Sequence, residues 1–338
     1  ANASKEANAS KEANASKEAA NASLKTHRTH LRLASNTTTT MTTTTLDCHT
    51  PYPGEPCYEA VMWHKWIGLV ENPTWYTTIT RESNRFAIQE YLFEKGEGQC
   101  KRPCPGAYPV PQNNPNGHPS IYCFSVSRAG PEMDLMYVQR QAGAGIFSCD
   151  AYEIFSDHDM ELDGFRTTVI PSTASGTSVD KTAANSQVFM STWMAILHTD
   201  GWWKHDFIVK ADPDAVLFAE RLRGHLQWHV GQSVFFLNCA KYIPETMYGA
   251  LEVYSKGALG AYLSQHAQCE HSLPFWAWGE DRYMANCLEM LGVHAQPDYN
   301  NFLHDDRCWG VDCGNKAAVA FHPFKSTNVW YRCYLASK

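Results

Sequence analysis

The chain has 338 residues, of which 44% are hydrophobic, and a formal net charge of −7 at pH 7. A chain of this length has room for about two domains. The acidic balance argues against nucleic acid as a partner, because binding to phosphates requires a basic surface. No uninterrupted apolar run reaches the roughly 18 residues of a transmembrane helix, so we expect no membrane span.

The twelve cysteines favour an oxidising compartment, and the absence of a Cys-x-x-Cys pair favours disulfides over zinc for most of them. The nearest cysteines have spacings that suit loops. We therefore expect Cys48–Cys57 and Cys100–Cys104 to be local bridges. The chain begins at a small residue and shows no signal peptide, so we expect a processed protein that is secreted or lies in the Golgi lumen.

The other cysteines leave alternatives open. Cys308 and Cys313 could be joined to each other through a five-residue loop, or each could reach Cys269 or Cys333. Two more lie in apolar runs and could be free core thiols: Cys123 and Cys239.

Residues 1–45 have a composition unlike the rest of the chain. Residues 1–18 repeat ANASKE three times, and 37–45 are rich in threonine. All Asn-x-Ser/Thr glycosylation patterns lie in this segment: Asn2, Asn8, Asn14, Asn21 and Asn36. A period of six fits a strand or polyproline II and not an α-helix. We expect an extended, glycosylated arm that promotes self-association, with a disordered linker as the alternative.

Residues 46–118 form a second segment, a small cysteine-bearing module. Residues 57–72 have helical apolar spacing before Pro73, and a second helix is expected from a cap at Ser83 to Gly96. A loop rich in proline, asparagine and glycine follows and makes a natural boundary at residue 118.

From residue 119 to 338 the pattern alternates between apolar strands and amphipathic helices. The expected strands are 119–129, 146–156 and 205–211, and the expected helices are 131–145, 189–197 and 215–226. Pro131 suits the first turn of its helix. The alternation predicts an α/β domain with a mixed, mostly parallel sheet flanked by helices.

A pair of carboxylates follows one of these strands. The run HDFIVKADPDAVLF leads from an apolar strand into Asp212-Pro213-Asp214. Ligands of open α/β sheets bind at the carboxyl ends of strands, and two such carboxylates can share Mn²⁺ or Mg²⁺. The alternative is a simple turn, for which Asp-Pro-Asp is well suited. Another Asp-x-Asp pattern occurs at 157–159.

Two further features come later in the chain. Glu280 and Asp281 precede an apolar-periodic helix, where capping of the helix is the alternative role. His322 follows the apolar run AVAF, where a structural role is the alternative to ligand binding.

These features occur in a recognisable order. The motifs ADPDAV, YGALEVYSKGAL, GEDRYMANCLEMLGV and FHPFK follow one another between residues 119 and 333. In this order and spacing the chain resembles the GT-A-fold glycosyltransferases, in particular the fringe-like and β-1,3-galactosyltransferase-like branch. From DCHTPYPGEPC onward it also resembles secreted microalgal proteins that combine this domain with a cysteine-rich front module.

The resemblance implies roles on the donor side of a glycosyl transfer. Asp212, Asp214 and His322 would bind Mn²⁺ or Mg²⁺ and, through it, the diphosphate of a nucleotide sugar, with a UDP-sugar as the expected donor. Asp150, taken to close the second strand, would contact the nucleoside. The related enzymes often have a third aspartate where this chain has Pro213, and the identities of donor and acceptor do not carry over.

The resemblance also implies roles on the acceptor side. Asp281, with Glu280 beside it, would remove the proton of the acceptor hydroxyl. Trp276 and Trp278 could stack on an acceptor sugar, although burial in the core is the alternative for at least one of them.

Three functions are compatible with this sequence. The first is a glycosyltransferase of the secretory pathway that acts on a glycan or protein acceptor, which the complete set of motifs favours. The second is an extracellular structural glycoprotein that keeps the fold and assembles into filaments through residues 1–45. The third is a lectin-like module that uses the same cleft without a nucleotide.

Overall fold

The structure, a computed structural model, describes residues 48–104, 118–179, 181–199, 201–241 and 246–338. The predicted arm at 1–45 therefore lies outside the described residues, and so do all of its glycosylation sites: Asn2, Asn8, Asn14, Asn21 and Asn36. None of the helices in the described ranges is both long and apolar enough to cross a membrane.

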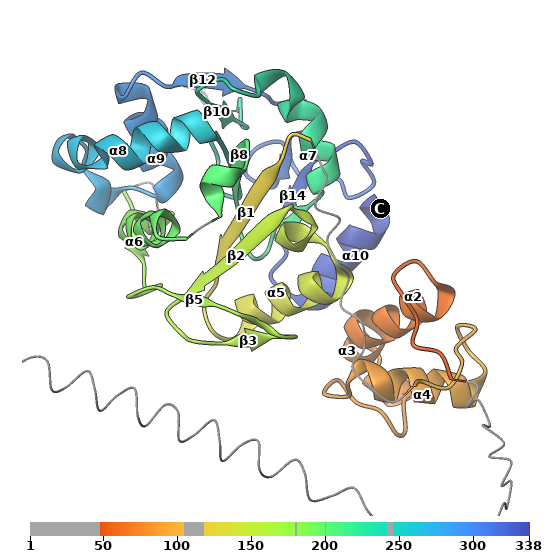
Figure 1. Cartoon of the computed structure of the whole chain (residues 1–338). Coiled ribbons are helices and arrows are strands. Elements are labelled where there is room, and N and C mark those ends of the chain that lie inside the picture. Colours follow the sequence, from red (N-terminus) through yellow and green to blue (C-terminus); the bar gives the residue numbers. More distant parts are fainter. Residues whose placement is uncertain (1–47, 105–117, 180, 200, 242–245) are drawn as a thin grey trace, which may run out of the picture. The chain divides into compact units, whose positions relative to one another are not determined.

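The central element of the described part is a seven-stranded sheet (Figure 1). Its order is β12 (His294–Pro297), β10 (Val234–Leu237), β11 (Leu251–Ser255), β8 (Phe207–Ala211), β1 (Ile121–Val126), β2 (Ala151–Ser156) and β5 (Thr168–Val169). Strand β11 is antiparallel to both of its neighbours, and the other neighbouring pairs are parallel. The prediction of a mixed, mostly parallel sheet is confirmed.

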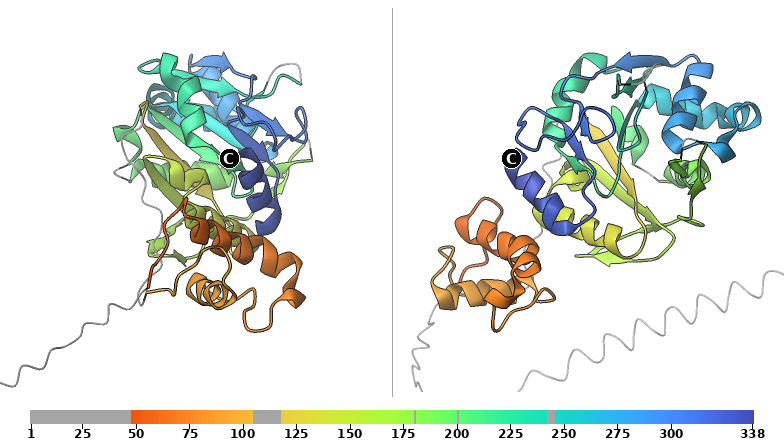
Figure 2. Two further views of the ribbon diagram at one scale, coloured as in Figure 1. Left: turned by 90° about the vertical axis from the view of Figure 1, so that its right-hand side faces the viewer. Right: turned by 180° about the vertical axis from the view of Figure 1, so that it is seen from behind.

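Helices cover both faces of this sheet, which is why its central strands read as continuous apolar runs. Successive residues of a strand point to opposite faces. Ile121 and Cys123 of β1 accordingly pack in one core, and Tyr122 and Phe124 in another. The first core includes α5 (Pro131–Ala142) and α7 (Ala219–Leu226), and the second includes α6 (Ser186–Leu197), α8 (Lys256–Ser272) and α9 (Glu280–Met290). The C-terminal helix α10 (Thr327–Ser337) lies beside α5 (Figure 2).

A small second sheet positions the candidate site. It consists of β13 (Leu303–Asp305), β14 (Ala320–His322) and β9 (Val216–Leu217). Strand β9 begins just after Asp214, and it pairs antiparallel with β14, which ends at His322. This pairing brings together two segments that are far apart in the sequence.

The remaining elements are short or lie in residues 48–104, the described part of the predicted front module. The module contains α2 (Pro56–Trp63), η1 (His64–Gly68), α3 (Leu69–Glu71), η2 (Pro73–Trp75) and α4 (Arg85–Lys95). There are two short antiparallel pairs, β3 (Glu161–Leu162) with β4 (Phe165–Arg166) and β6 (Gly176–Thr177) with β7 (Ala183–Ala184). The short helices are η3 (Gly145–Ser148), η4 (Trp202–Lys204), η5 (Gln227–His229) and η6 (Phe275–Ala277).

Three local predictions need correction. Helix α4 is capped by Asn84, whose Oδ1 accepts from the Ala87 N–H, and not by Ser83. The predicted strand 146–156 begins as the short helix η3, so that only its second half is β2. The predicted helix 215–226 begins with strand β9, because this segment pairs with β14.

All twelve cysteines form disulfides, and the predicted local bridges Cys48–Cys57 and Cys100–Cys104 are wrong. The pairs are Cys48–Cys104, Cys57–Cys100, Cys123–Cys149, Cys239–Cys308, Cys269–Cys287 and Cys313–Cys333. Helix α4 packs against α2 in one apolar cluster. Cys100, which follows α4, packs against the same cluster and so lies beside Cys57. Cys123 and Cys239, for which the sequence left a free thiol open, are both bridged. Of the alternatives left open by the sequence, the pairing of Cys313 with Cys333 is confirmed.

Candidate functional site

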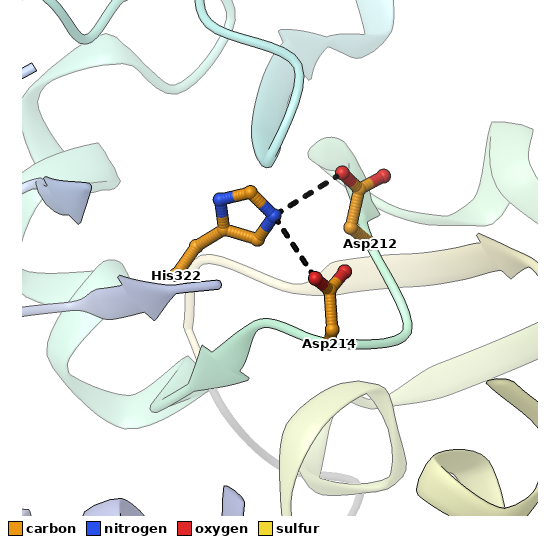
Figure 3. Close-up of side chains that lie close together, drawn as sticks. All are labelled: Asp212, Asp214 and His322. Carbon is orange, nitrogen blue, oxygen red and sulfur yellow. Dashed lines mark ion pairs between the residues drawn. The ribbon is translucent and has the colours of Figure 1, made fainter. Parts of the chain in front are cut away.

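Two aspartates and a histidine converge at the carboxyl end of β8. Asp212 and Asp214 lie in the turn that follows this strand, and His322 lies at the end of β14. The His322 Nε2 atom is 3.3 Å from Asp214 Oδ2 and 3.8 Å from Asp212 Oδ2 (Figure 3). One ligand atom from each residue lies within 4.8 Å of the others. The structure thus brings together the three residues that the sequence suggested as metal ligands.

The Asp305 carboxylate contacts Nδ1 of His322, the ring nitrogen that does not face the two aspartates. The register of β13 and β14 pairs the two residues, and Asp305 Oδ2 lies 2.5 Å from His322 Nδ1. Asp305 is fully buried. The carboxylate accepts a hydrogen bond from the Nδ1–H group, so that Nε2 is the nitrogen that faces the two aspartates. Sequence reasoning missed this residue.

The pKa shifts in the cluster leave His322 protonated and Asp214 ionised at neutral pH. Burial by itself would lower the pKa of His322, but hydrogen bonds with Asp214 and Asp305 outweigh this effect and raise it to about 9. Burial would likewise raise the pKa of Asp214, but its hydrogen bonds with His322 and Lys325 outweigh that effect and lower it. Asp214 is therefore ionised at neutral pH.

The residue types fit a divalent cation. Carboxylate oxygens suit Mg²⁺ and Mn²⁺, and an imidazole nitrogen is an accepted ligand for a transition metal. Asp214 Oδ2 also has Lys325 Nζ at 2.5 Å, and the lysine side chain is 77% exposed. Positive charge therefore already lies against this carboxylate in the protein itself, on a side chain that is mostly exposed to solvent.

The predicted acidic pair lies at the start of α9. Glu280 is buried, and its N–H donates to Asn185 Oδ1 at 3.0 Å. Asp281 accepts from the Gly249 N–H at 3.0 Å and from the Arg282 N–H at 2.7 Å. Burial and repulsion from Glu280 raise the pKa of Asp281 to about 7. A carboxyl group with this pKa can take up and release a proton near neutral pH.

Lys210 connects the metal-ligand cluster with the acidic pair. Its Nζ lies 2.7 Å from Asp212 Oδ1, 2.7 Å from Glu280 Oε1 and 3.3 Å from Glu252 Oε1. Burial would lower the pKa of Lys210, but attraction to these three carboxylates outweighs it and raises the pKa well above its ordinary value. Sequence reasoning missed this residue too. The available signal was a lysine inside an apolar strand, two residues before an aspartate.

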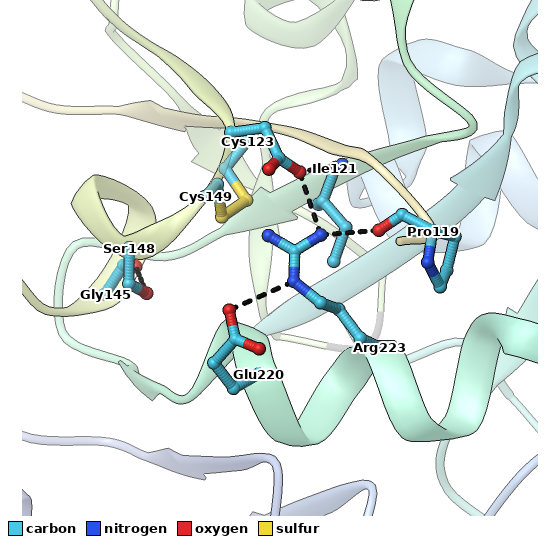
Figure 4. Close-up of a disulfide and its surroundings, with 9 residues drawn as sticks. Pro119, Ile121, Cys123, Gly145, Ser148, Cys149, Glu220 and Arg223 are labelled. Atoms are coloured by element: carbon cyan, nitrogen blue, oxygen red, sulfur yellow. Dashed lines mark hydrogen bonds and ion pairs between the residues drawn. A yellow bond between two sulfur atoms is a disulfide. The ribbon is translucent and has the colours of Figure 1, made fainter. Parts of the chain in front are cut away.

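Asp150 does not belong to this group, and the interpretation that it closes the second strand is wrong. Strand β2 begins at Ala151, so Asp150 lies at the amino end of the parallel strands, whereas Asp212 follows a carboxyl end. The Asp150 carboxylate pairs with Arg223 at 2.8 Å and accepts from the Ile121 N–H. This buried pair lies near the Cys123–Cys149 disulfide, beside which Figure 4 shows Arg223.

The two candidate tryptophans differ in accessibility. Trp276 in η6 is 67% exposed. Trp278 is partly buried, and the Arg282 guanidinium lies 4.4 Å from the centroid of its ring. Trp276 therefore presents its ring to solvent just before the acidic pair, whereas one face of Trp278 is covered.

Comparisons with known proteins find likeness to solved structures at low similarity only. No protein-family model and no curated protein matches the sequence. A glycosyltransferase involved in glycosylation of the major capsid of PBCV-1 overlaps 64% of this chain and 100% of its own, with 9% identity and a TM-score of 0.39. The galactosyltransferase LgtC, solved with donor and acceptor sugar analogues, overlaps 55% of this chain and 76% of its own, with 6% identity and a TM-score of 0.32. At these scores the overlap carries no conclusion about the function of this chain.

Proposed function

We propose that the protein is a metal-dependent glycosyltransferase that moves a sugar from a nucleotide sugar, a UDP-sugar in the first instance, to a glycan or protein acceptor. One observation carries the proposal. A cluster of Asp212, Asp214 and His322 with the geometry of a cation site is linked through the buried Lys210 to Glu280, and the next residue, Asp281, has a pKa of about 7. A cation can neutralise a diphosphate, and a base can take the proton of an acceptor hydroxyl, so the two groups together suit sugar transfer from a nucleotide sugar.

The donor side of the reaction would be held by three side chains. Asp212, Asp214 and His322 would bind Mn²⁺ or Mg²⁺, and this ion, when bound, neutralises the negative charge of the diphosphate. Two carboxylates and one imidazole leave room in the usual coordination number for diphosphate oxygens. Asp305 keeps the His322 ring in the orientation that binding needs.

The acceptor side would use Asp281 as the base. It takes the proton of the acceptor hydroxyl as that oxygen forms its bond to the anomeric carbon and the bond from this carbon to the diphosphate oxygen breaks. Burial, together with the charge of Glu280 beside it, raises the pKa of Asp281 to about 7, which suits this task. The exposed Trp276 would stack on the acceptor sugar, with Trp278 as a secondary candidate.

The compartment and the family branch are part of this proposal. Six disulfides suit a secreted protein or one in the Golgi lumen. The fringe-like branch rests on the order of the sequence motifs and stays a prediction.

Calorimetry with a UDP-sugar, in the presence and absence of Mn²⁺, tests the donor site. We expect binding by the native protein only with the cation, and loss of binding in Asp212→Asn and Asp214→Asn, because each substitution removes a ligand charge. Asp159→Asn is the matched control, since this aspartate belongs to the other Asp-x-Asp pattern and is exposed. Equal binding by native protein and both ligand variants would overturn the proposal.

The alternative of a self-assembling glycoprotein rests on the confinement of all glycosylation patterns to residues 1–45. Sedimentation of the full chain and of residues 46–338 tests it. Assembly that is lost with the arm would support this role, and equal assembly of both forms would exclude it.

A further inference from the structure

We propose that Lys210 is a positioning residue that holds the candidate cation ligand Asp212 and the acidic residue Glu280 in one arrangement and thereby couples the two groups. This inference builds on the cation site of the proposed function and assigns a role to a residue outside its ligands and its base.

The strand pairing explains how a lysine comes to lie in the core. In β8, Phe207 and Val209 pack in one core, and Ile208 packs in the other. Alternation therefore directs Lys210 toward the face that α6 and α9 cover. Its Nζ lies 4.8 Å from the centroid of the Phe189 ring of α6, and the side chain is 1% exposed.

Each carboxylate around Lys210 is delivered by a different element. Glu252 is its direct partner on the neighbouring strand β11, Glu280 begins α9, and Asp212 follows β8 itself. The Gly249 carbonyl accepts a further hydrogen bond from Nζ. The ammonium group thus contacts three segments of the fold: the turn after β8, strand β11 and the start of α9.

The geometry at Asp212 shows what this contact does for cation binding. Lys210 occupies Oδ1 at 2.7 Å, and Oδ2 is the oxygen that faces His322 Nε2. Lys210 therefore selects the oxygen that a cation would meet, as Asp305 selects the nitrogen of His322. Residues that orient metal ligands in this way contribute about 10- to 100-fold to metal affinity.

The same ammonium group lies 2.7 Å from Glu280 Oε1, so Asp212 and Glu280 share Lys210 as their counter-ion. Glu280 thereby helps to fix the ammonium group at the point where it contacts Asp212 Oδ1. A change at Glu280 is then expected to alter cation affinity through Lys210, although Glu280 is not among the candidate ligands.

A charge-neutral double variant tests the positioning role. Removal of Lys210 alone would leave buried carboxylates unpaired, which destabilises a fold strongly. Lys210→Met combined with Glu280→Gln removes one charge of each sign and keeps the side-chain volumes similar. We expect the Kd for Mn²⁺, measured by calorimetry without nucleotide, to rise about 10- to 100-fold.

The matched control removes a buried ion pair at the opposite edge of the sheet. Arg223→Met with Asp150→Asn deletes the pair at 2.8 Å near the Cys123–Cys149 disulfide. It tests whether the loss of a buried pair by itself weakens Mn²⁺ binding, and we expect no change in the Kd. Thermal unfolding of both double variants identifies any general loss of structure.

A single variant keeps the proposal testable if the double variant does not fold. Glu280→Gln removes one of the carboxylates that fix the Lys210 ammonium group, so that Lys210 orients Asp212 less firmly and Mn²⁺ binds more weakly. Asp281→Asn removes the neighbouring charge, but this carboxylate is held by Gly249 and Arg282. We therefore expect a smaller effect from Asp281→Asn.

The outcomes separate this inference from the proposed function. Native protein that binds Mn²⁺, together with an unchanged Kd in the Lys210→Met and Glu280→Gln double variant, would overturn the role of Lys210 alone. An effect of Glu280→Gln no larger than that of Asp281→Asn would also count against it. Native protein that does not bind Mn²⁺ would overturn the proposed function itself.

Discussion

Replacement of Asp305 by asparagine is expected to weaken cation binding without removing a ligand. Asp305 is fully buried, and its Oδ2 lies 2.5 Å from His322 Nδ1. A carboxylate can only accept at this position, which keeps a proton on Nδ1. Because the pKa of His322 is about 9, Nε2 is also protonated at neutral pH in the protein without a cation, and a cation would bind at Nε2 in place of that proton. An asparagine amide has the same shape but can also donate a hydrogen bond to Nδ1. It therefore permits the tautomer with the proton on Nε2, in which Nε2 cannot bind a cation.

The expected loss of cation affinity in Asp305→Asn can be estimated from other proteins in which a carboxylate contacts a metal-binding histidine. Loss of a carboxylate behind a metal-binding histidine typically costs about 10- to 100-fold in affinity, which corresponds to about 1.4–2.7 kcal/mol. Calorimetric titration with Mn²⁺ measures it directly. Asp306→Asn is the control, because the next residue along the chain is also an aspartate and is exposed. Equal Mn²⁺ affinity of the folded Asp305 and Asp306 variants would refute the reasoning.

Two further predictions concern the base and a disulfide. Asp281→Asn should spare Mn²⁺-dependent binding of a UDP-sugar and abolish transfer, because it removes the base. In the native protein, burial and Glu280 raise the pKa of Asp281 to about 7. A base acts when deprotonated, so transfer should increase as the pH rises through this value, and a flat pH–rate profile would contradict the assignment. Replacement of Cys123 and Cys149 by alanine opens a loop with a sequence separation of 26. It should lower the free energy of unfolding by about 3.5 kcal/mol in denaturant titrations while the Mn²⁺ affinity stays the same, and an unchanged unfolding midpoint would be inconsistent with this bond.

Much of the fold follows from local patterns in the sequence. The apolar runs of β1 and β8 predict buried strands, and Pro131 at the start of α5 and Gly96 after α4 mark helix ends in the structure as in the sequence. These signals are local, since they depend on side-chain periodicity and on the backbone preferences of single residues. Sequence reasoning was weaker at element boundaries, where strand pairing turned the start of one predicted helix into β9.

The candidate ligands were also recognisable in the sequence, because Asp212 and Asp214 follow a strand and His322 lies in a motif of fixed order. Their convergence depends on the tertiary structure. His322 reaches the aspartates because β14 pairs with β9, more than a hundred residues earlier in the chain. Asp150 could not be placed correctly from sequence, since the boundary between η3 and β2 decides at which edge of the sheet it lies.

The sequence by itself determined the residue types of the candidate site, the order of its motifs and the α/β alternation that carries them. Only the tertiary structure decided the disulfide pairing, the contact of Asp305 with His322 and the burial of Lys210 among three carboxylates. Each of these contacts joins segments that no local pattern links. Their partners are selected by strand register and by the packing of α9 on the sheet, because a buried charge is stable only where the whole fold supplies its counter-charges.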